Sequence, residues 1–153
     1  MRTLAVGDIH GCYRALRTLE AFVKFQPDDH IITLGDHIHR GPDSRSVIEW
    51  LIDRQGKGHL TALRGNHECV FQAAITSELD RETWLGFGGD QMLASYNVQS
   101  INQMPIEHRA FLQSGLKDFY ENDTHFCVHA NARADLALKD QTERMLFWKK
   151  FGD

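Results

Sequence analysis

Side chains that commonly bind metal ions stand at the ends of several short apolar stretches of this sequence. They are Asp8, His10, Asp36, Asn66 and His129. About 30 residues separate Asp8 from Asp36 and Asp36 from Asn66, which is the length of one strand with the helix that follows it. Because ligands bind at the carboxyl ends of the strands in open α/β sheets, we expect these side chains to meet at one edge.

This set of side chains matches what a pair of divalent cations requires. Two such ions need a carboxylate that bridges them, flanking nitrogen and oxygen ligands, and open positions for water and a phosphoryl oxygen. Mixed Asp, His and Asn ligands suit Mn, Fe or Zn better than Mg or Ca, which prefer oxygen throughout. The predicted chemistry is attack on phosphorus by a hydroxide held between two metal ions. The alternative is that these polar residues only form turns at strand ends.

Three strand–loop–helix units are predicted to position these residues. Residues 4–6, 31–34 and 60–63 are short apolar runs, and a loop that contains glycine follows each of them. Apolar residues recur at helical spacing over residues 12–23, and Pro42 is placed to begin the second helix. Repeated units of this kind predict right-handed βαβ crossovers and a parallel sheet.

The second half of the chain predicts further elements around the same sheet. Residues 83–89 predict a loop rich in glycine and aromatic residues, and residues 106–116 predict a helix. Residues 124–128 predict a strand that ends at His129. Residues 136–151 mix apolar and charged side chains and predict a helix or turn.

Other reactive or aromatic residues are given structural roles. The three cysteines share no metal-binding spacing and are predicted to be reduced thiols in the core. Trp50 and Trp148 are predicted to lie in the core, whereas Trp84 and Phe87 fit core packing and substrate contact equally well. The histidines outside the motifs are predicted to be surface or strand residues, and they are His30, His59, His108 and His125.

Composition excludes several classes of protein. The chain has 153 residues, 42% hydrophobic and 25% charged, which predicts a single globular domain over residues 1–153. A net charge of -4 without a basic stripe argues against nucleic acid as a partner. The sequence has neither a secretory signal nor an apolar run of the roughly 18 residues that cross a membrane. We therefore expect a cytoplasmic protein with no membrane partner.

Four motifs occur in order, and together they resemble those of a known family. They are GDIHG at residues 7–11, GDHIHRG at residues 35–41, GNHE at residues 65–68 and VHA at residues 128–130. This pattern resembles the calcineurin-like metallophosphoesterases of the serine/threonine protein phosphatase type, and the bacterial small-phosphatase branch looks closest. The resemblance covers nearly the whole chain and implies an α/β fold of the αββα sandwich type.

The resemblance also implies roles for individual residues. It places Asp8 and His10 on the first of two divalent metal ions, Asp36 between the ions, and Asn66 with His129 on the second. Manganese is the expected metal, with iron or zinc as alternatives. Two further residues are implied in catalysis: His67 as the general acid that protonates the leaving group, and Arg40 as a bidentate phosphate clamp.

His39 departs from the family pattern, which has aspartate at this position as the partner of the GNHE histidine. A carboxylate orients an imidazole and raises its pKa, whereas a second imidazole does neither. We therefore expect His67 to be a weaker acid, with rates lowered more for alkyl than for aryl phosphoesters. If the loop stays extended, His37 and His39 point to opposite sides of it. One of them is an added metal ligand in the less favoured interpretation, and both are tolerated loop histidines in the other.

The family pattern continues to a Gly-His-Thr segment, which has no counterpart in the 153 residues. Its histidine completes the shell of the second metal, so the resemblance implies weaker binding there unless another chain, a nearby histidine or solvent fills the position. The sandwich is expected to be incomplete at the C-terminus, with an exposed strand edge that a homodimer would cover.

The predicted function is metal-dependent hydrolysis of phosphomonoesters. Phosphorylated proteins are the expected substrates, with small phosphoesters as the simpler case. A dinucleoside polyphosphate hydrolase shares the early motifs and is the enzymatic alternative, although GNHE rather than GNHD favours the phosphatase branch. The alternative from another class is a catalytically impaired relic that retains metal or phosphate binding.

Overall fold

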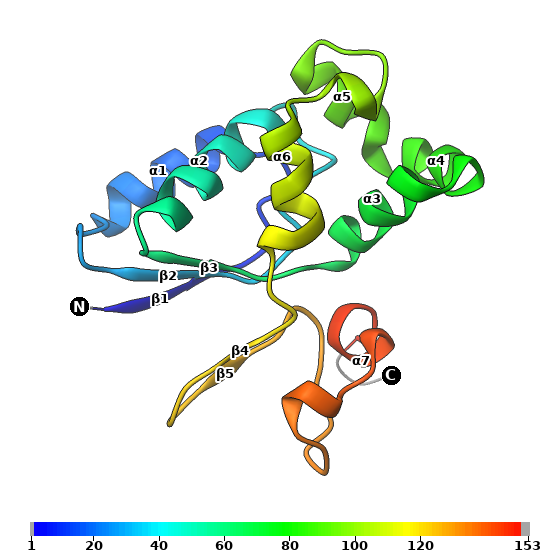
Figure 1. Cartoon of the computed structure of the whole chain (residues 1–153). Coiled ribbons are helices and arrows are strands. Elements are labelled where there is room, and N and C mark those ends of the chain that lie inside the picture. Colours follow the sequence, from blue (N-terminus) through cyan, green and yellow to red (C-terminus); the bar gives the residue numbers. More distant parts are fainter. Residues whose placement is uncertain (1, 151–153) are drawn as a thin grey trace.

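A three-stranded parallel sheet forms the centre of the fold in the computed structural model, which describes residues 2–150 (Figure 1). Its strands lie in the order β1 (Thr3–Val6), β2 (His30–Thr33) and β3 (Leu60–Ala62). Helices α1 (Tyr13–Val23) and α2 (Ser44–Gly56) make the two connections. In the register, Leu4 lies opposite Ile31 and Ile32 lies opposite Thr61. The predicted βαβ units and parallel sheet are therefore confirmed.

Local sequence explains where α2 begins. The Asp43 side chain is its N-cap and accepts a hydrogen bond from Ser46 N at 3.0 Å, which satisfies one of the free N–H groups of the first turn. Pro42 precedes this cap rather than beginning the helix. The buried side chains of Val47, Ile48 and Leu51 follow at helical spacing and face the core.

Four more helices continue the same layer after β3. They are α3 (Asn66–Thr76), α4 (Glu78–Trp84), α5 (Asp90–Tyr96) and α6 (Ile106–Ala110), with a short 3-10 turn at Ile101–Gln103. Figure 1 shows α1, α2 and α6 on one side of the parallel sheet. The helical layer therefore covers a single face of that sheet.

Two predicted elements differ from what the structure contains. Residues 83–89, predicted as a loop, are the end of α4 and a π-helical turn at Leu85–Gly89. Within this turn Gly88 leaves the helical conformation, with φ of 111°, which glycine adopts without strain. Residues 106–116, predicted as one helix, are α6 followed by a π-helical turn at Phe111–Gly115.

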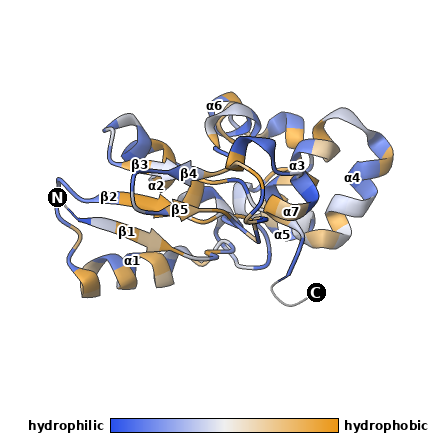
Figure 2. Cartoon of the chain, turned by 90° about the horizontal axis from the view of Figure 1, so that it is seen from below, coloured by the Kyte–Doolittle hydropathy of each residue, from blue (hydrophilic) through white to orange (hydrophobic). Residues whose placement is uncertain are grey.

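The part of the chain that follows residue 116 lies on the opposite side of the sheet (Figure 1). Strands β4 (Tyr120–Glu121) and β5 (Phe126–Cys127) pair as an antiparallel hairpin, followed by a 3-10 turn at Leu138–Asp140 and by α7 (Glu143–Phe147). The hairpin and α7 lie on the side away from α1 and α2 in Figure 1. Figure 2 shows the hairpin in front of the parallel sheet, with hydrophobic residues along β2. The predicted strand at residues 124–128 is thus present but shorter.

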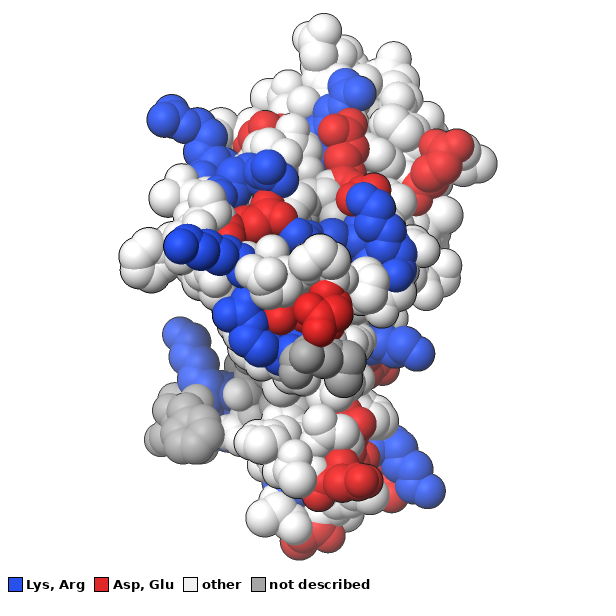
Figure 3. Space-filling model, turned by 90° about the vertical axis from the view of Figure 1, so that its left-hand side faces the viewer, with Lys and Arg blue, Asp and Glu red and all other residues white. Residues whose placement is uncertain are grey.

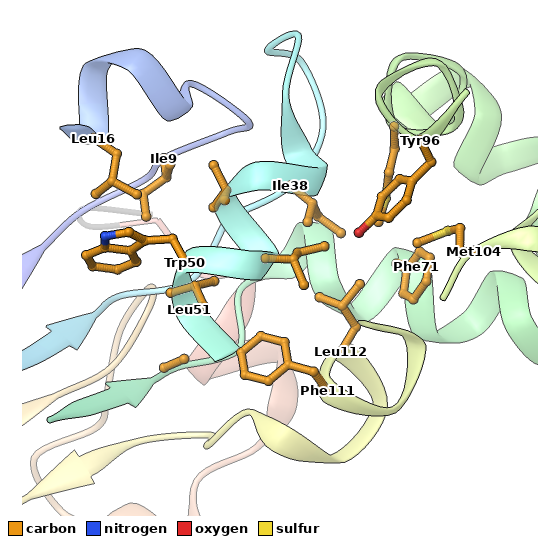
Figure 4. Close-up of a cluster of buried hydrophobic side chains, with 14 of the residues drawn as sticks. Ile9, Leu16, Ile38, Trp50, Leu51, Phe71, Tyr96, Met104, Phe111 and Leu112 are labelled. Carbon is orange, nitrogen blue, oxygen red and sulfur yellow. The ribbon is translucent and has the colours of Figure 1, made fainter. Parts of the chain in front are cut away.

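The hydrophobic core lies between α2 and the helices that follow β3 (Figure 4). Ile38, Leu51, Phe71 and Leu112 each have an exposed fraction of 0%. Ile38 belongs to the loop after β2, and burying such a side chain contributes about 2 kcal/mol. Burial of Ile38 therefore holds in place the loop that carries Asp36.

Several single-residue predictions are corrected. Trp50 is buried as predicted, but Trp148 is 48% exposed because α7 ends beside it at the surface. His108 is buried rather than exposed, and the Tyr96 hydroxyl lies 2.8 Å from its Nδ1. The cysteines are free thiols but not core residues, since Cys12 is exposed and the other two are half-buried. No helix in the described part of the chain is long and apolar enough to cross a membrane.

Candidate metal centre and active site

The loops after β1 and β2 are bonded directly to each other. The backbone N–H groups of Ile9 and His10 donate to Asp36 O at 3.0 and 2.9 Å, and Gly11 N donates to His37 O at 2.8 Å. His10 and Asp36 both have positive φ angles, of 46° and 51°, a conformation that non-glycine residues rarely adopt. These bonds place the residues of the first two motifs side by side.

Glycine is required where the second and third loops meet. Gly35 has φ of 98°, and a Cβ there would lie 2.7 Å from Gly65 N and 2.8 Å from His129 Nδ1. A Cβ at Gly65 would collide with the Asp36 carboxylate. The glycines of the two motifs therefore let the Asp36 loop, the Asn66 loop and His129 approach one another closely.

Asp36 lies at the centre of the group that results. Its Oδ2 is 3.6 Å from His10 Nε2, and its Oδ1 is 3.5 Å from His129 Nε2. The two carboxylate oxygens thus face two different imidazoles. Burial, and then the charge of Glu68, raises the Asp36 pKa above its ordinary value.

Asp8 and Asn66 complete the group, one on each side of Asp36. Asp8 Oδ2 is 3.7 Å from His10 Nε2, and Asn66 Oδ1 is 3.0 Å from His129 Nε2. The structure therefore brings together all five side chains that the sequence indicates as metal ligands, in the two subsets expected for two ions.

The two imidazoles are oriented as metal ligands usually are. His10 Nδ1 lies 3.1 Å from the carbonyl of Ile38, and His129 Nδ1 lies 2.8 Å from the carbonyl of Leu34. A hydrogen bond from Nδ1 to a carbonyl leaves Nε2 with its lone pair free to bind a metal. Both Nε2 atoms face Asp36, so the donor set fits a pair of divalent cations.

Glu68 holds the loops together, a role that the motif spelling does not predict. Its fully buried carboxylate accepts hydrogen bonds from Asp36 N at 2.9 Å, His37 N at 2.8 Å and Gly65 N at 2.8 Å. Burial by itself would raise its pKa, but His37 and the backbone donors outweigh burial and hold the pKa below its ordinary value. The signal available in the sequence was the last residue of GNHE.

His67 lies beside the metal-ligand group. Its backbone N–H donates to Asp36 Oδ1 at 3.1 Å, and its Nε2 is 3.9 Å from Asp36 Oδ2. Donor atoms of His10, Asp36 and His67 all lie within 4.8 Å of one another. Burial, followed by the charges of His10 and Arg40, lowers the His67 pKa to about 4. The residue indicated as the acid is thus also within reach of a metal bound by His10 and Asp36.

The loop histidines His37 and His39 are both buried and have different neighbours. His37 Nε2 lies 2.9 Å from Thr33 Oγ1, and its Nδ1 lies 3.5 Å from Glu68 Oε1. His39 Nδ1 lies 2.8 Å from His67 Nδ1, so His39 is the partner of the GNHE histidine. Burial, then the charge of His67, lowers the His39 pKa to about 3. Neither joins the group of close donor atoms found in the described residues.

Trp84 and Phe87 are the two residues near His67 whose roles the sequence left open, and the Phe87 ring packs on His67 with centroids 4.5 Å apart. Trp84 contacts the histidine beside it. Its indole Nε1 donates to His39 Nε2 at 2.7 Å, and its side chain is fully buried. It therefore touches the partner of His67 instead of open space at the cleft. No spacing in the sequence connects position 84 with position 39.

A cavity of about 450 Å³ has Asp8 and His10 in its lining, and two others border the centre. One of about 490 Å³ is lined by four of the five predicted ligands and by residues from the end of the described chain. Its lining residues are Asp8, Asp36, Asn66, His129, Ala130, Phe147, Trp148, Lys149 and Lys150. The other, of about 340 Å³, has Arg40, His67 and Phe87 in its lining. Arg40 is exposed and lies next to His67, and Lys149 and Lys150 add positive charge on the other side.

Comparisons with known proteins agree with this geometry. The family description "Calcineurin-like phosphoesterase" matches residues 1–151. "Serine/threonine-protein phosphatase 2" of Escherichia coli (strain K12) is 38% identical over 86 residues, which are 56% of this chain and 37% of that protein. "Bis(5'-nucleosyl)-tetraphosphatase, symmetrical" of Methylococcus capsulatus is 36% identical over 151 residues, which are 93% of this chain and 53% of that protein.

A solved structure shares the fold. The metallophosphoesterase from Sphaerobacter thermophilus aligns with a TM-score of 0.64 and 22% identity, covering 99% of this chain and 51% of its own. The chain thus spans between about a third and a half of the length of these relatives. The four motifs, the αβ arrangement and the matched span agree, and the chain belongs to the calcineurin-like phosphoesterase family.

Proposed function

We propose that this chain carries the metal centre of a phosphomonoester hydrolase of the serine/threonine protein phosphatase type. The observation that carries the proposal is the position of Asp36, whose two carboxylate oxygens face His10 and His129 at 3.6 and 3.5 Å. A carboxylate so placed can bind two ions at once, and phosphoester hydrolysis is the chemistry that such pairs support.

The two ions would have separate ligand sets that share one residue. Asp8, His10 and Asp36 would hold the first ion, and Asp36, Asn66 and His129 the second. When bound, the ions supply Lewis acidity and an activated water. Imidazole, amide and carboxylate donors favour manganese, with iron or zinc as alternatives.

The remaining polar residues would bind and orient the substrate. The Arg40 guanidinium can hold two phosphoryl oxygens at once from the rim beside His67. His67 lines the same cavity, and its Nε2 would donate a hydrogen bond or proton to the leaving group, while His39 would hold its ring in position. The missing family aspartate at position 39 supports weakened turnover of alkyl phosphates.

A second candidate function is hydrolysis of dinucleoside polyphosphates. It is favoured by the relative from Methylococcus capsulatus, which aligns over 93% of this chain and is named for that activity. Lys149 and Lys150 lie in the lining of the larger cavity and would suit a substrate with several phosphates. A catalytically impaired relic that retains metal or phosphate binding is the alternative outside the enzymes.

Partners follow from the same proposal. A phosphorylated protein or small phosphoester is the proposed substrate, in the cytoplasm. On the face in Figure 3, basic and acidic side chains are interspersed and form no basic stripe of the kind that binds nucleic acid. Nucleic acid is therefore not proposed as a partner. A homodimer would cover apolar surface near β5, where Phe126 is 57% exposed, and light scattering of the full chain at high concentration tests it. A monomer throughout would contradict dimerisation.

The test combines metal content with turnover. After dialysis against Mn²⁺, mass spectrometry should find two metal ions per chain, and hydrolysis of p-nitrophenyl phosphate should require them. Phosphoserine peptides and bis(5′-nucleosyl) tetraphosphate, assayed side by side, distinguish the two enzymatic candidates. Stoichiometric metal without turnover of any of the three would support the relic.

The variant Asp36→Asn tests the central residue. It should lower metal affinity and turnover by at least about 100-fold, because even residues that only orient metal ligands contribute up to that much. Asp53→Asn is the matched control, since Asp53 forms an exposed ion pair with Lys57 at 2.6 Å. Unchanged metal binding in Asp36→Asn would overturn the proposed centre.

A further inference from the structure

The direction of one buried hydrogen bond is set by Trp84. Its indole Nε1 lies 2.7 Å from His39 Nε2, and both side chains have exposed fractions of 0%. An indole nitrogen can only donate, so His39 Nε2 must accept. A neutral imidazole has one donor and one acceptor nitrogen, and the His39 proton therefore lies on Nδ1.

The position of the His39 proton determines which nitrogen of His67 is protonated. His39 Nδ1 lies 2.8 Å from His67 Nδ1, a contact that needs one donor and one acceptor. Because His39 Nδ1 carries the proton, His67 Nδ1 accepts, and the His67 proton lies on Nε2. The reverse arrangement would turn a His39 N–H toward the Trp84 N–H inside the core, where no water replaces the lost bond.

The proton on His67 Nε2 faces the metal centre. This atom is buried and has no hydrogen-bond partner among the described residues, and Asp36 Oδ2 lies 3.9 Å away. The His67 ring packs against the rings of His10 and Phe87, with centroids 4.6 and 4.5 Å apart. Two ring contacts and the His39 hydrogen bond therefore restrict the orientation of the His67 ring.

A glycine-rich turn makes room for this arrangement. A Cβ at Gly88 would lie 2.7 Å from the His39 Cβ, and a Cβ at Gly89 would lie within 3 Å of the Trp84 ring. The Phe71 ring also packs edge to face against Trp84, with centroids 5.9 Å apart. The turn at Leu85–Gly89 thus packs closely against both Trp84 and His39.

We propose that Trp84 is a positioning residue that acts through His39: its N–H selects the His39 tautomer, which keeps the His67 proton on Nε2. The part that concerns substrate rests on the proposed function, whereas the two tautomers are a property of the protein alone. His67 then offers a hydrogen bond to a phosphoryl or leaving-group oxygen. A neutral imidazole is a poor source of a full proton, so substrates with good leaving groups are favoured.

Ring nitrogens of histidine report their protonation in two-bond ¹H–¹⁵N correlation spectra, which provide the test. The full-length, metal-free protein is labelled with ¹⁵N and recorded at neutral pH, with single histidine variants for assignment. The expected result is a proton on Nδ1 of His39 and on Nε2 of His67. The opposite tautomer at either residue overturns the proposal.

Three variants separate the hydrogen bond from packing. Trp84→Phe removes the N–H but keeps an aromatic ring, and should give His39 and His67 mixtures of both tautomers. Trp50→Phe is the matched control, because the buried Trp50 donates to Glu20 Oε2 at 3.4 Å far from the site, and both tautomers should be unchanged. His39→Asp supplies only acceptor oxygens, so the His67 proton should move to Nδ1.

Each outcome decides one claim. If Trp84→Phe keeps the His39 proton on Nδ1 and the His67 proton on Nε2, as in the wild type, the indole does not select these tautomers and the proposal is wrong. If that variant does not fold, the wild-type tautomers together with the shift to Nδ1 in His39→Asp decide the matter. If the protein has the predicted tautomers but no phosphatase activity, the role of Trp84 is supported and the proposed function is refuted instead.

Discussion

Asp36 and His67 show how this site depends on single atoms. Asp36 combines two ligand subsets because its two oxygens face different imidazoles, and burial, followed by the charge of Glu68, raises its pKa. His67 lies beside Asp36 Oδ2, the oxygen that also faces His10, and burial is the chief cause that lowers the His67 pKa to about 4. At neutral pH the metal-free protein therefore has a neutral imidazole where the family pattern implies an acid.

The substitution His39→Asp should restore part of that acid function. A carboxylate beside His67 Nδ1 would raise the His67 pKa and stabilise the charged ring. Turnover of alkyl phosphates should rise by at least about tenfold relative to aryl phosphates, because leaving groups that need a proton gain most. Steady-state rates on both substrates measure this ratio. His125→Asp, at an exposed position, is the control, and an equal change for both substrate classes would contradict the prediction.

At the scale of elements, Glu68 joins the ends of two strands. Located in the first turn of α3, it receives N–H groups from the loop after β2 and from the loop after β3. These loops carry Asp36 and Asn66, so the distance between the predicted ligands depends on a residue that binds neither metal nor substrate. A buried carboxylate with several donors is also a large contribution to local rigidity.

Replacing Glu68 with glutamine should destabilise the fold. The amide keeps one acceptor oxygen but turns N–H groups toward backbone donors, leaving buried groups without partners. The free energy of unfolding should fall by about 3 kcal/mol in urea titrations of the metal-free protein. Glu49→Gln breaks an exposed ion pair with Arg45 and should cost less than about 1 kcal/mol. A similar small loss in both variants would show that Glu68 does not hold the loops.

For the whole molecule, buried histidines link stability to pH. His39, His67 and His108 all have pKa values lowered from 6.5, to about 3 and about 4 for the first two, and burial is the largest cause in each. The unfolded chain binds protons at these residues before the folded protein does. Their contribution to stability is therefore fully present above about pH 6.5 and is lost as the pH falls toward 4.

Acid should accordingly destabilise the metal-free protein well above the pH at which most carboxylates titrate. Between pH 7 and pH 4 the free energy of unfolding should fall by at least about 2 kcal/mol, since each pKa unit corresponds to about 1.4 kcal/mol. Urea titrations at several pH values measure it. His108→Gln should make the dependence shallower, whereas His125→Gln, at an exposed residue, should leave it unchanged. A flat profile in the parent protein would contradict this assignment.

The sequence by itself determined the parallel sheet, the meeting of the predicted ligands at one edge and the family. Each depends on local patterns. Short apolar runs form strands, glycine-containing loops follow them, and these loops carry the predicted ligands, such as Asp36 after β2 and Asn66 after β3. Trp50 could likewise be assigned to the core, because a large aromatic side chain within a helical apolar pattern is usually buried.

Only the tertiary structure decided which atoms face one another. The contact of Trp84 with His39, the three bonds to Glu68 and the burial of His108 depend on side chains that are distant in sequence, and no spacing encodes them. The glycines of residues 85–89 predict a loop, yet the structure forms a π-helical turn there that packs closely against His39 and Trp84. Hydrogen-bond direction and burial act through space, whereas strand and helix patterns act along the chain.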